Sequence, residues 1–201
     1  MSAENLREVA RIAVRDEVQR HAWALFAHQG FEATTIDQIA EAAGMSRRTF
    51  FRYFSGKDEL IIEKLVEAGE RIAAALAERP EGESAWVALR AAFDVVVLSQ
   101  ESRPEQARAL RLMLRDEHGV RASAEEWRRR WTDLLAPQVA RRLPPAGVRR
   151  DPDPDPDPRA VAVAGSALAC LDAAQLAWAE HPGSRLAALL DEAMSAVARL
   201  A

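Results

Sequence analysis

The chain has 201 residues and a formal net charge of -4, with 27 lysines and arginines against 31 aspartates and glutamates. This balance excludes a generally basic protein that coats nucleic acid through its overall charge, so any affinity for nucleic acid has to come from a local patch. With 49% hydrophobic residues the chain can bury a substantial core, and its length suits one small domain joined to one larger helical domain.

The cysteine content and the apolar runs indicate where in the cell the protein is located. The one cysteine, Cys170, lies in an alanine-rich stretch and is expected to be a buried, inert thiol. The first residues lack the uncharged apolar core of a signal peptide, and no apolar run is expected to reach the length of a membrane span. These features predict a cytoplasmic protein.

The first predicted helix carries a basic row and then an apolar stripe. Arg7, Arg11 and Arg15 recur every four residues and so line one side of a helix. Two interpretations stay open: the arginines touch DNA phosphates or enter a minor groove, or they pair with acids of a solvated face. Those acids are Glu4, Glu8 and Asp16.

Farther along this helix, an inward stripe is expected to pack on the segment that follows. It consists of Val18, Ala22, Leu25 and Phe26, and Gly30 then ends the helix.

Residues 34–60, TTIDQIAEAAGMSRRTFFRYFSGKDEL, predict two short helices joined by a glycine turn. Thr35 caps the first helix, with Gln38 as its partner in a capping box. Gly44 supplies the left-handed residue that ends a helix, and Ser46 caps the second one. The turn is therefore specified at both ends, as a DNA-binding helix-turn-helix requires.

The second short helix is cationic. Arg47, Arg48 and Arg52 lie on it, Lys57 follows, and no acidic residue occurs from 42 to 57. Such a patch neutralises phosphates, and residues at the N-terminal end of a recognition helix reach base edges, which makes Arg47, Arg48 and Thr49 the candidates for base contacts. The alternative is an ordinary amphipathic helix whose arginines are only solvated.

The pattern of spaced residues between positions 7 and 65 closely resembles the N-terminal domain of the tetracycline-repressor (TetR) family. The matching residues are Arg15, Val18, Ala22, Leu25, Phe26, Gly30, Thr34, Thr35, Ile36, Ile39, Ala40, Ala43, Gly44, Met45, Ser46, Thr49, Phe50, Phe51, Tyr53, Phe54, Lys57 and Leu60.

The resemblance implies a DNA-binding domain over residues 1–60 and an effector-binding and dimerisation domain over residues 61–201. It implies phosphate contacts from Thr35, Tyr53 and Lys57 and base contacts from the start of the third helix. The full set of expected DNA-binding residues is Thr35, Ser46, Arg47, Arg48, Thr49, Arg52, Tyr53 and Lys57. The family usually has glycine in place of Arg48 and tyrosine in place of Phe51, so an operator sequence cannot be borrowed from a relative.

The rest of the chain predicts helices only. An amphipathic helix runs from Lys57 to about residue 79 and links the two domains; in the family it transmits ligand binding to the DNA-reading helices. Further helices are expected from Ser84 through Val97, from Arg103 to about Gly119, and from a capping box at Ser123.

The segment 144–158 ends in DPDPDPDP and is expected to be an extended, solvated linker loop; an acidic recognition tail is the alternative.

Two final helices, 159–180 and 184–200, are rich in alanine. Small side chains permit close helix approach, so these helices are expected to form a homodimer interface, with burial inside a monomer as the alternative.

The expected effector contacts are large or polar side chains of the second domain. They are Trp86, Phe93, Met113, Trp127, Trp131, Gln175 and Trp178. Aromatic residues at helical spacing also serve as plain core, so that interpretation stays open. Residues 103–131 resemble the C-terminal half of regulators of the mycofactocin-regulator type, a resemblance that implies an acyl-CoA-like effector.

Enzymatic motifs are lacking in the sequence. The four histidines are scattered, and there is no phosphate-binding glycine loop, paired-cysteine metal motif or nucleophile elbow, so no catalytic residue, metal or cofactor is expected. The cluster Asp116, Glu117 and His118 is typical of a helix end.

The sequence thus predicts a dimeric repressor released from a palindromic operator by a small molecule. The alternatives are an activator or effector-independent regulator, and a helical ligand-binding or enzymatic protein with an incidental helix-turn-helix.

Overall fold

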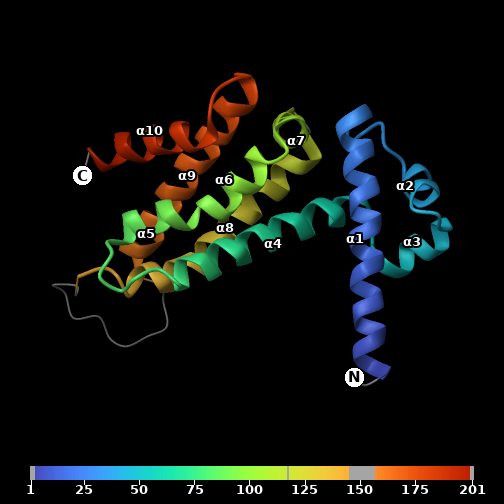
Figure 1. Ribbon diagram of the computed structural model, residues 1–201, viewed down its shortest axis with the longest axis horizontal. Helices are drawn as coiled ribbons and strands as arrows, with labels where there is room; N and C mark the ends of the chain where they lie inside the picture. Colours follow the sequence, from blue (N-terminus) through green and yellow to red (C-terminus); the bar gives the residue numbers. More distant parts are fainter. Residues whose placement is uncertain (1–2, 117, 145–156, 200–201) are drawn as a thin grey trace.

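The computed structural model describes residues 3–116, 118–144 and 157–199, which form α-helices and no strand (Figure 1). The predicted all-α fold is therefore confirmed. The N-terminal domain contains α1 (Ala3–Gln29), α2 (Ile36–Ala42) and α3 (Arg47–Tyr53), and α4 (Lys57–Ala77) runs from it into the second domain. In Figure 1, α2 and α3 lie on one side of α1 and the second domain lies on the other.

The caps of the helix-turn-helix follow the chemistry predicted from the sequence. Thr35 Oγ1 accepts a hydrogen bond from the Gln38 N–H at 3.2 Å, and Gln38 Oε1 accepts one from the Thr35 N–H at 2.9 Å. Ser46 Oγ accepts a hydrogen bond from the Thr49 N–H at 3.1 Å. Gly44 has φ of 66°, in the left-handed region that a Cβ atom disfavours. Together these contacts fix the angle between α2 and α3.

A compact aromatic core holds α1, α2 and α3 together with the start of α4. Phe50 and Phe54 of the α3 region stack at 5.3 Å between ring centroids, and Phe26 contacts Phe31 at 5.0 Å. The buried residues of this core are Val18, Ala22, Trp23, Phe26, Phe31, Ile39, Ala40, Phe50, Phe54, Leu60 and Ile61. Leu60 and Ile61 belong to α4, so the start of α4 is packed into this core.

The second domain contains six further helices in the described residues. They are α5 (Ala85–Ala92), α6 (Asp94–Glu101), α7 (Pro104–Asp116), α8 (His118–Ala140), α9 (Pro158–Glu180) and α10 (Leu186–Ala198). Its core joins α4, α5, α6, α8, α9 and α10 around side chains such as Leu89, Leu171 and Trp178.

Two helix boundaries differ from the sequence prediction. The single helix expected from Ser84 is divided at Phe93, where the Val96 N–H donates to the Phe93 carbonyl at 3.0 Å in a tightened turn. The helix expected to open at Ser123 instead begins at His118, so the predicted Ser123 cap is wrong. Gly119 does not stop α8, because a glycine inside a helix costs only about 1 kcal/mol relative to alanine.

Helix α9 begins at Pro158, next to the predicted start at residue 159. Although no apolar run was expected to reach the length of a membrane span, this helix is long and apolar enough to do so by length and composition alone. Nine of its side chains are nevertheless buried against the protein core, among them Leu171 and Trp178. Its apolar composition is accounted for by packing between α8 and α10.

The predicted linker over 144–158 is described only at its two ends. Asp157 caps α9 by accepting a hydrogen bond from the Arg159 N–H at 2.9 Å, and Pro158 takes the first helical position. Arg159 Nη1 also donates to the Pro144 carbonyl at 3.0 Å, which joins the two ends. Residues 145–156 lie outside the described residues.

Candidate DNA interface and effector cavity

The N-terminal end of α3 presents a cationic surface. Arg47 and Arg48 are exposed there, and Arg52 lies one turn farther along. Arg47 Nη1 lies 2.9 Å from Asp37 Oδ2, in a pair whose side chains are 59% and 63% exposed. Exposed pairs of this kind contribute little, so Arg47 can exchange Asp37 for a base or a phosphate at small cost.

The other side chains of this surface are partly committed to local contacts. Thr49 Oγ1 lies 2.9 Å from Ser46 Oγ at the cap of α3. The Arg52 guanidinium lies 5.1 Å from the centroid of the Tyr53 ring, and that of Arg47 lies 5.6 Å from the Phe51 ring. Phe51, which stands in place of the family's tyrosine, is 45% exposed and offers an apolar face but no hydroxyl.

Lys57 differs from the role that the resemblance implies. Its ammonium donates to the carbonyls of Phe31, Thr34 and Glu32 at 2.7, 3.3 and 3.4 Å and lies 4.2 Å from the Phe31 ring centroid. All three ammonium protons are thus directed at the loop between α1 and α2. In this arrangement Lys57 joins α4 to the loop between α1 and α2, and the phosphate contact expected of it stays a prediction.

The basic row of α1 is also divided between different partners. Arg11 pairs with Glu8 on the exposed surface, with Arg11 Nη2 and Glu8 Oε1 3.0 Å apart. Arg15 instead bonds Glu59 Oε1 at 2.8 Å, and it also contacts Glu63 and the Tyr53 carbonyl.

Neither interpretation of the basic row therefore holds for Arg15, which ties α1 to α3 and α4. Burial by itself raises the pKa of Glu59, but hydrogen bonds from Ser55 and Arg15 outweigh that effect and lower the pKa overall.

A cavity of about 860 Å³ lies where the two domains meet, within the size range of small-molecule sites. Helices α1, α4, α6, α7, α8 and α9 line it, and α4 runs from the cavity to the core of the DNA-binding domain. Three of the predicted effector contacts, Trp127, Trp131 and Gln175, come together in its wall.

The remaining predicted effector contacts do not line this cavity. Phe93 and Trp178 are buried in the core of the second domain, and Trp86 packs against that core. The Arg108 guanidinium covers the Trp178 ring at 4.5 Å. These three residues follow the alternative interpretation of plain core. The Met113 side chain lies outside the described residues.

The cavity wall combines apolar and cationic side chains, most of which were not predicted from the sequence. Ile61, Leu65 and Leu171 form part of the apolar surface. Seven cationic residues face three acidic ones, Asp16, Glu67 and Asp172. The seven are Arg20, Lys64, Arg71, Arg103, Arg111, Arg115 and Arg128. Lys64 pairs with Glu67, Arg111 with Asp172, and Arg115 with Glu180 outside the lining. The lining still holds more cations than acids, which suits a ligand with an anionic part.

Trp131 joins α8 to α4 at the cavity. Its Nε1 donates to the Leu65 carbonyl at 3.0 Å. A Cβ atom added to Gly69 would lie 2.5 Å from this nitrogen, so only glycine permits the close approach. The cavity is therefore attached directly to the helix that enters the DNA-binding domain.

The helices α9 and α10 pack against each other, and α10 extends toward the end of the molecule away from α1 (Figure 1). Small residues remain exposed along the outer face of α9, at Ala162, Ser166, Ala169 and Ala173. This face has the small side chains that close helix packing needs.

Within the searched part of the chain, no group of histidine, cysteine and acidic residues has the arrangement of a metal site.

Comparisons with known proteins agree with this architecture. A family model described as "Bacterial regulatory proteins, tetR family" matches residues 20–63, and one described as "MftR C-terminal domain" matches residues 83–200. The HTH-type transcriptional regulator TcmR of Streptomyces glaucescens is 41% identical over 92 residues, covering 46% of this chain and 41% of that protein. The chain thus matches less than half the length of this curated relative.

Two solved structures extend the likeness to nearly the whole chain. The fatty acid degradation regulator FadR from Bacillus halodurans shares the fold, with a TM-score of 0.65, 18% identity and coverage of 90% of this chain and 93% of that one. FadR from Thermus thermophilus, a TetR-family repressor in complex with lauroyl-CoA, has a TM-score of 0.54, 26% identity and coverage of 90% and 91%. Since the MftR model alone covers more than half of the sequence and the tetR model covers the helix-turn-helix, the chain belongs to the TetR family of bacterial regulatory proteins.

Proposed function

We propose that this protein is a dimeric transcriptional repressor of the bacterial cytoplasm that binds a palindromic operator and leaves it when a small molecule fills the cavity. The observation that carries the proposal is the exposed cationic end of α3 on a chain of net charge -4. The base-reading residues are Arg47, Arg48 and Thr49, and Thr35 and Tyr53 flank them as phosphate contacts.

Helix α4 supports the coupling of ligand to DNA. Lys64, Leu65 and Arg71 of this helix line the cavity, while Leu60 and Ile61 lie in the core beneath α3. A ligand that fits the cavity in only one position of α4 shifts the population of DNA-binding conformers.

The effector class follows from the cavity wall. Cationic groups beside apolar ones suit an amphipathic anion, and we propose an acyl thioester of coenzyme A. The complex of the Thermus thermophilus relative with lauroyl-CoA supports this class.

The dimer is proposed to form through α9 and α10. The exposed small residues of α9 permit a second copy to approach closely, and a twofold axis there presents two α3 helices to successive major grooves. Ala169→Glu places a charge on this face and is expected to give monomers in sedimentation analysis. Ala74→Glu, at an exposed position of α4, is the matched control and is expected to remain dimeric.

The experiment that tests the function is selection of bound fragments from random duplex DNA at near-physiological salt. Recovery of an inverted repeat supports the proposal, and Arg47→Ala is expected to lose binding to it. Arg141→Ala, an exposed arginine of the second domain, serves as the control. Failure of the folded, ligand-free protein to select any motif would contradict the proposal. Release of the operator by lauroyl-CoA, and not by coenzyme A or laurate alone, tests the effector class.

A further inference from the structure

One wall of the cavity belongs to the DNA-binding domain itself. Helix α1 contributes Gln19, Arg20 and Trp23 to the lining, across from α7 and α8 of the second domain. The domains also touch beside the cavity, because Leu110 of α7 packs against the core of the DNA-binding domain. A molecule that fills this space therefore contacts both domains at once.

Two indole N–H groups in this wall lack a partner. Trp23 and Trp127 are 7% and 6% exposed, and both line the cavity, one from α1 and the other from α8. Neither Nε1 atom has a hydrogen-bond acceptor in the described structure. Both nitrogens are covered by neighbouring atoms in this conformation. Buried donors are normally satisfied, so we take the pair as donors that a ligand engages when it displaces the atoms covering them. By contrast, the Trp131 indole is already bonded to the Leu65 carbonyl.

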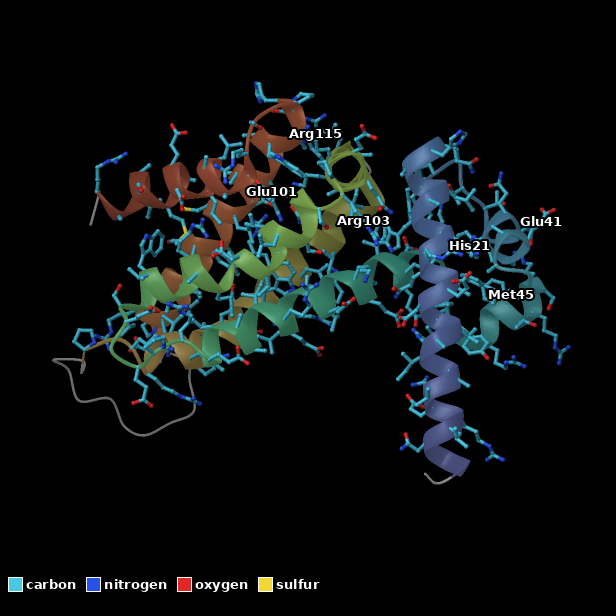
Figure 2. All side chains as sticks on the ribbon, in the orientation of Figure 1. His21, Glu41, Met45, Glu101, Arg103 and Arg115 are labelled. Carbon is cyan, nitrogen blue, oxygen red and sulfur yellow. The ribbon has the colours of Figure 1, made fainter. Side chains whose placement is uncertain are left out.

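Cationic side chains from both domains accompany these donors. Arg20 lies on α1, Lys64 on α4, and Arg103 between α6 and α7, on the side of the second domain that faces α1 in Figure 2. Arg20 pairs with Glu17 of its own helix, with side chains that are 63% and 53% exposed, and its Nη2 also lies 2.9 Å from His21 Nε2. Such a pair yields readily to a phosphate, which accepts stronger charge-assisted hydrogen bonds.

We infer that α1 is itself an effector-binding surface: the phosphate-bearing head of the ligand is held between Arg20 and Trp23 of the DNA-binding domain and Arg103 and Trp127 of the second domain. This inference rests on the proposed function and adds a second route for its regulation. The ligand acts on the DNA-binding domain by direct contact as well as through α4. The occupied cavity then fixes α1 against α7, and the ligand prefers that placement of the two domains.

The test measures binding of lauroyl-CoA to the full, DNA-free protein by calorimetry, so that DNA contacts play no part. Arg20→Ala is expected to weaken binding at least fivefold. Arg11→Ala is its matched control, because Arg11 forms the same kind of exposed pair on the same helix, with Glu8, yet lies outside the cavity lining. We expect Arg11→Ala to bind as the unmodified protein does.

Trp23→Phe removes the indole donor while keeping an aromatic ring in the core. It is expected to weaken lauroyl-CoA binding three- to tenfold while thermal unfolding remains cooperative. If this variant fails to fold, the exposed Arg20 decides the matter alone. Equal affinities for the unmodified protein, Arg20→Ala and Arg11→Ala overturn the inference.

Operator binding by the same preparations separates this inference from the proposed function. A protein that binds its operator but not lauroyl-CoA remains a DNA-binding regulator, and the bridging contact is then overturned. A protein that binds lauroyl-CoA with the expected loss in Arg20→Ala, yet selects no operator, supports the bridging site and contradicts the repressor.

Discussion

The DNA-binding domain and the second domain differ in how far apart in sequence the residues of their candidate sites lie. The cap of α3 and its candidate base contacts fall within residues 46–49, so local chemistry arranges them. The cavity instead gathers residues from Asp16 to Leu176, on six helices. The first site therefore depends on caps and on a few anchoring side chains, and the second depends on how whole helices pack.

Substitution of Arg15 is expected to destabilise the DNA-binding domain most, since this side chain joins α1 to α3 and α4. Its side chain is only 17% exposed, and its loss leaves the carboxylates of Glu59 and Glu63 without their shared cation. Breaking a fully buried pair costs about 3 to 5 kcal/mol, and solvent screens this partly exposed one, so we expect Arg15→Ala to lower the free energy of unfolding by about 2 kcal/mol. Chemical denaturation measures this, with Arg11→Ala as a control that changes little.

Gly69 is the corresponding test of helix packing at the cavity. Overpacking against Trp131 costs about 1 to 3 kcal/mol, offset by up to about 1 kcal/mol from the better helix propensity of alanine. We therefore expect Gly69→Ala to destabilise the protein by about 1 to 2 kcal/mol in denaturation experiments. In a Trp131→Leu background the same substitution is expected to become neutral or stabilising. Destabilisation that persists there would rule out the contact as its cause.

Substitution of Lys57 tests whether this side chain stabilises the DNA-binding domain or contacts a DNA phosphate. Lys57→Met removes three hydrogen bonds to the α1–α2 loop and is expected to cost about 1 kcal/mol of stability. Because its ammonium faces the protein, we expect the salt dependence of operator affinity to stay unchanged. Arg48→Ala, in contrast, is expected to leave stability unchanged and to reduce the salt slope by about 1. A weaker salt dependence of operator affinity for Lys57→Met would show that Lys57 makes the phosphate contact that the family resemblance implies.

The smallest expected effect is a pH dependence from Glu59. Its pKa is lowered in the folded protein below the ordinary value of 4.5, so its ionised form stabilises the fold. This contribution is fully present above pH 4.5 and is lost as the pH falls through the lowered pKa. We expect Glu59→Gln to make thermal stability less dependent on pH in that acidic range. Identical pH profiles for the variant and the unmodified protein would show that Glu59 contributes nothing.

Much of the DNA-binding domain was predictable from the sequence because its determinants are local. The capping box of Thr35 and Gln38, the left-handed Gly44 and the Ser46 cap are confirmed. Each depends on groups within a few residues of one another, for which residue type and spacing are sufficient. The assignment of the surface residues to DNA contacts stays a prediction.

The cavity that we propose as the effector site was only partly predictable, because aromatic residues at helical spacing look alike in sequence. Trp127 and Trp178 carry the same pattern, yet the first lines the cavity and the second is buried core. Trp23 of α1 was not singled out in the sequence, and nothing local indicates that it lines a cavity shared with the second domain. The helix boundaries at Phe93 and His118 were missed because no strong breaker or unique cap marks them.

By itself the sequence determined the all-α fold, the helix-turn-helix and its cationic surface, because periodicity, caps and charge act over a few residues. Only the tertiary structure decided that Lys57 and Arg15 anchor the domain, that Gly69 admits Trp131, and that the cavity is shared between the two domains. Those features arise where helices far apart in the chain meet, and they depend on side-chain volume and desolvation at the contact.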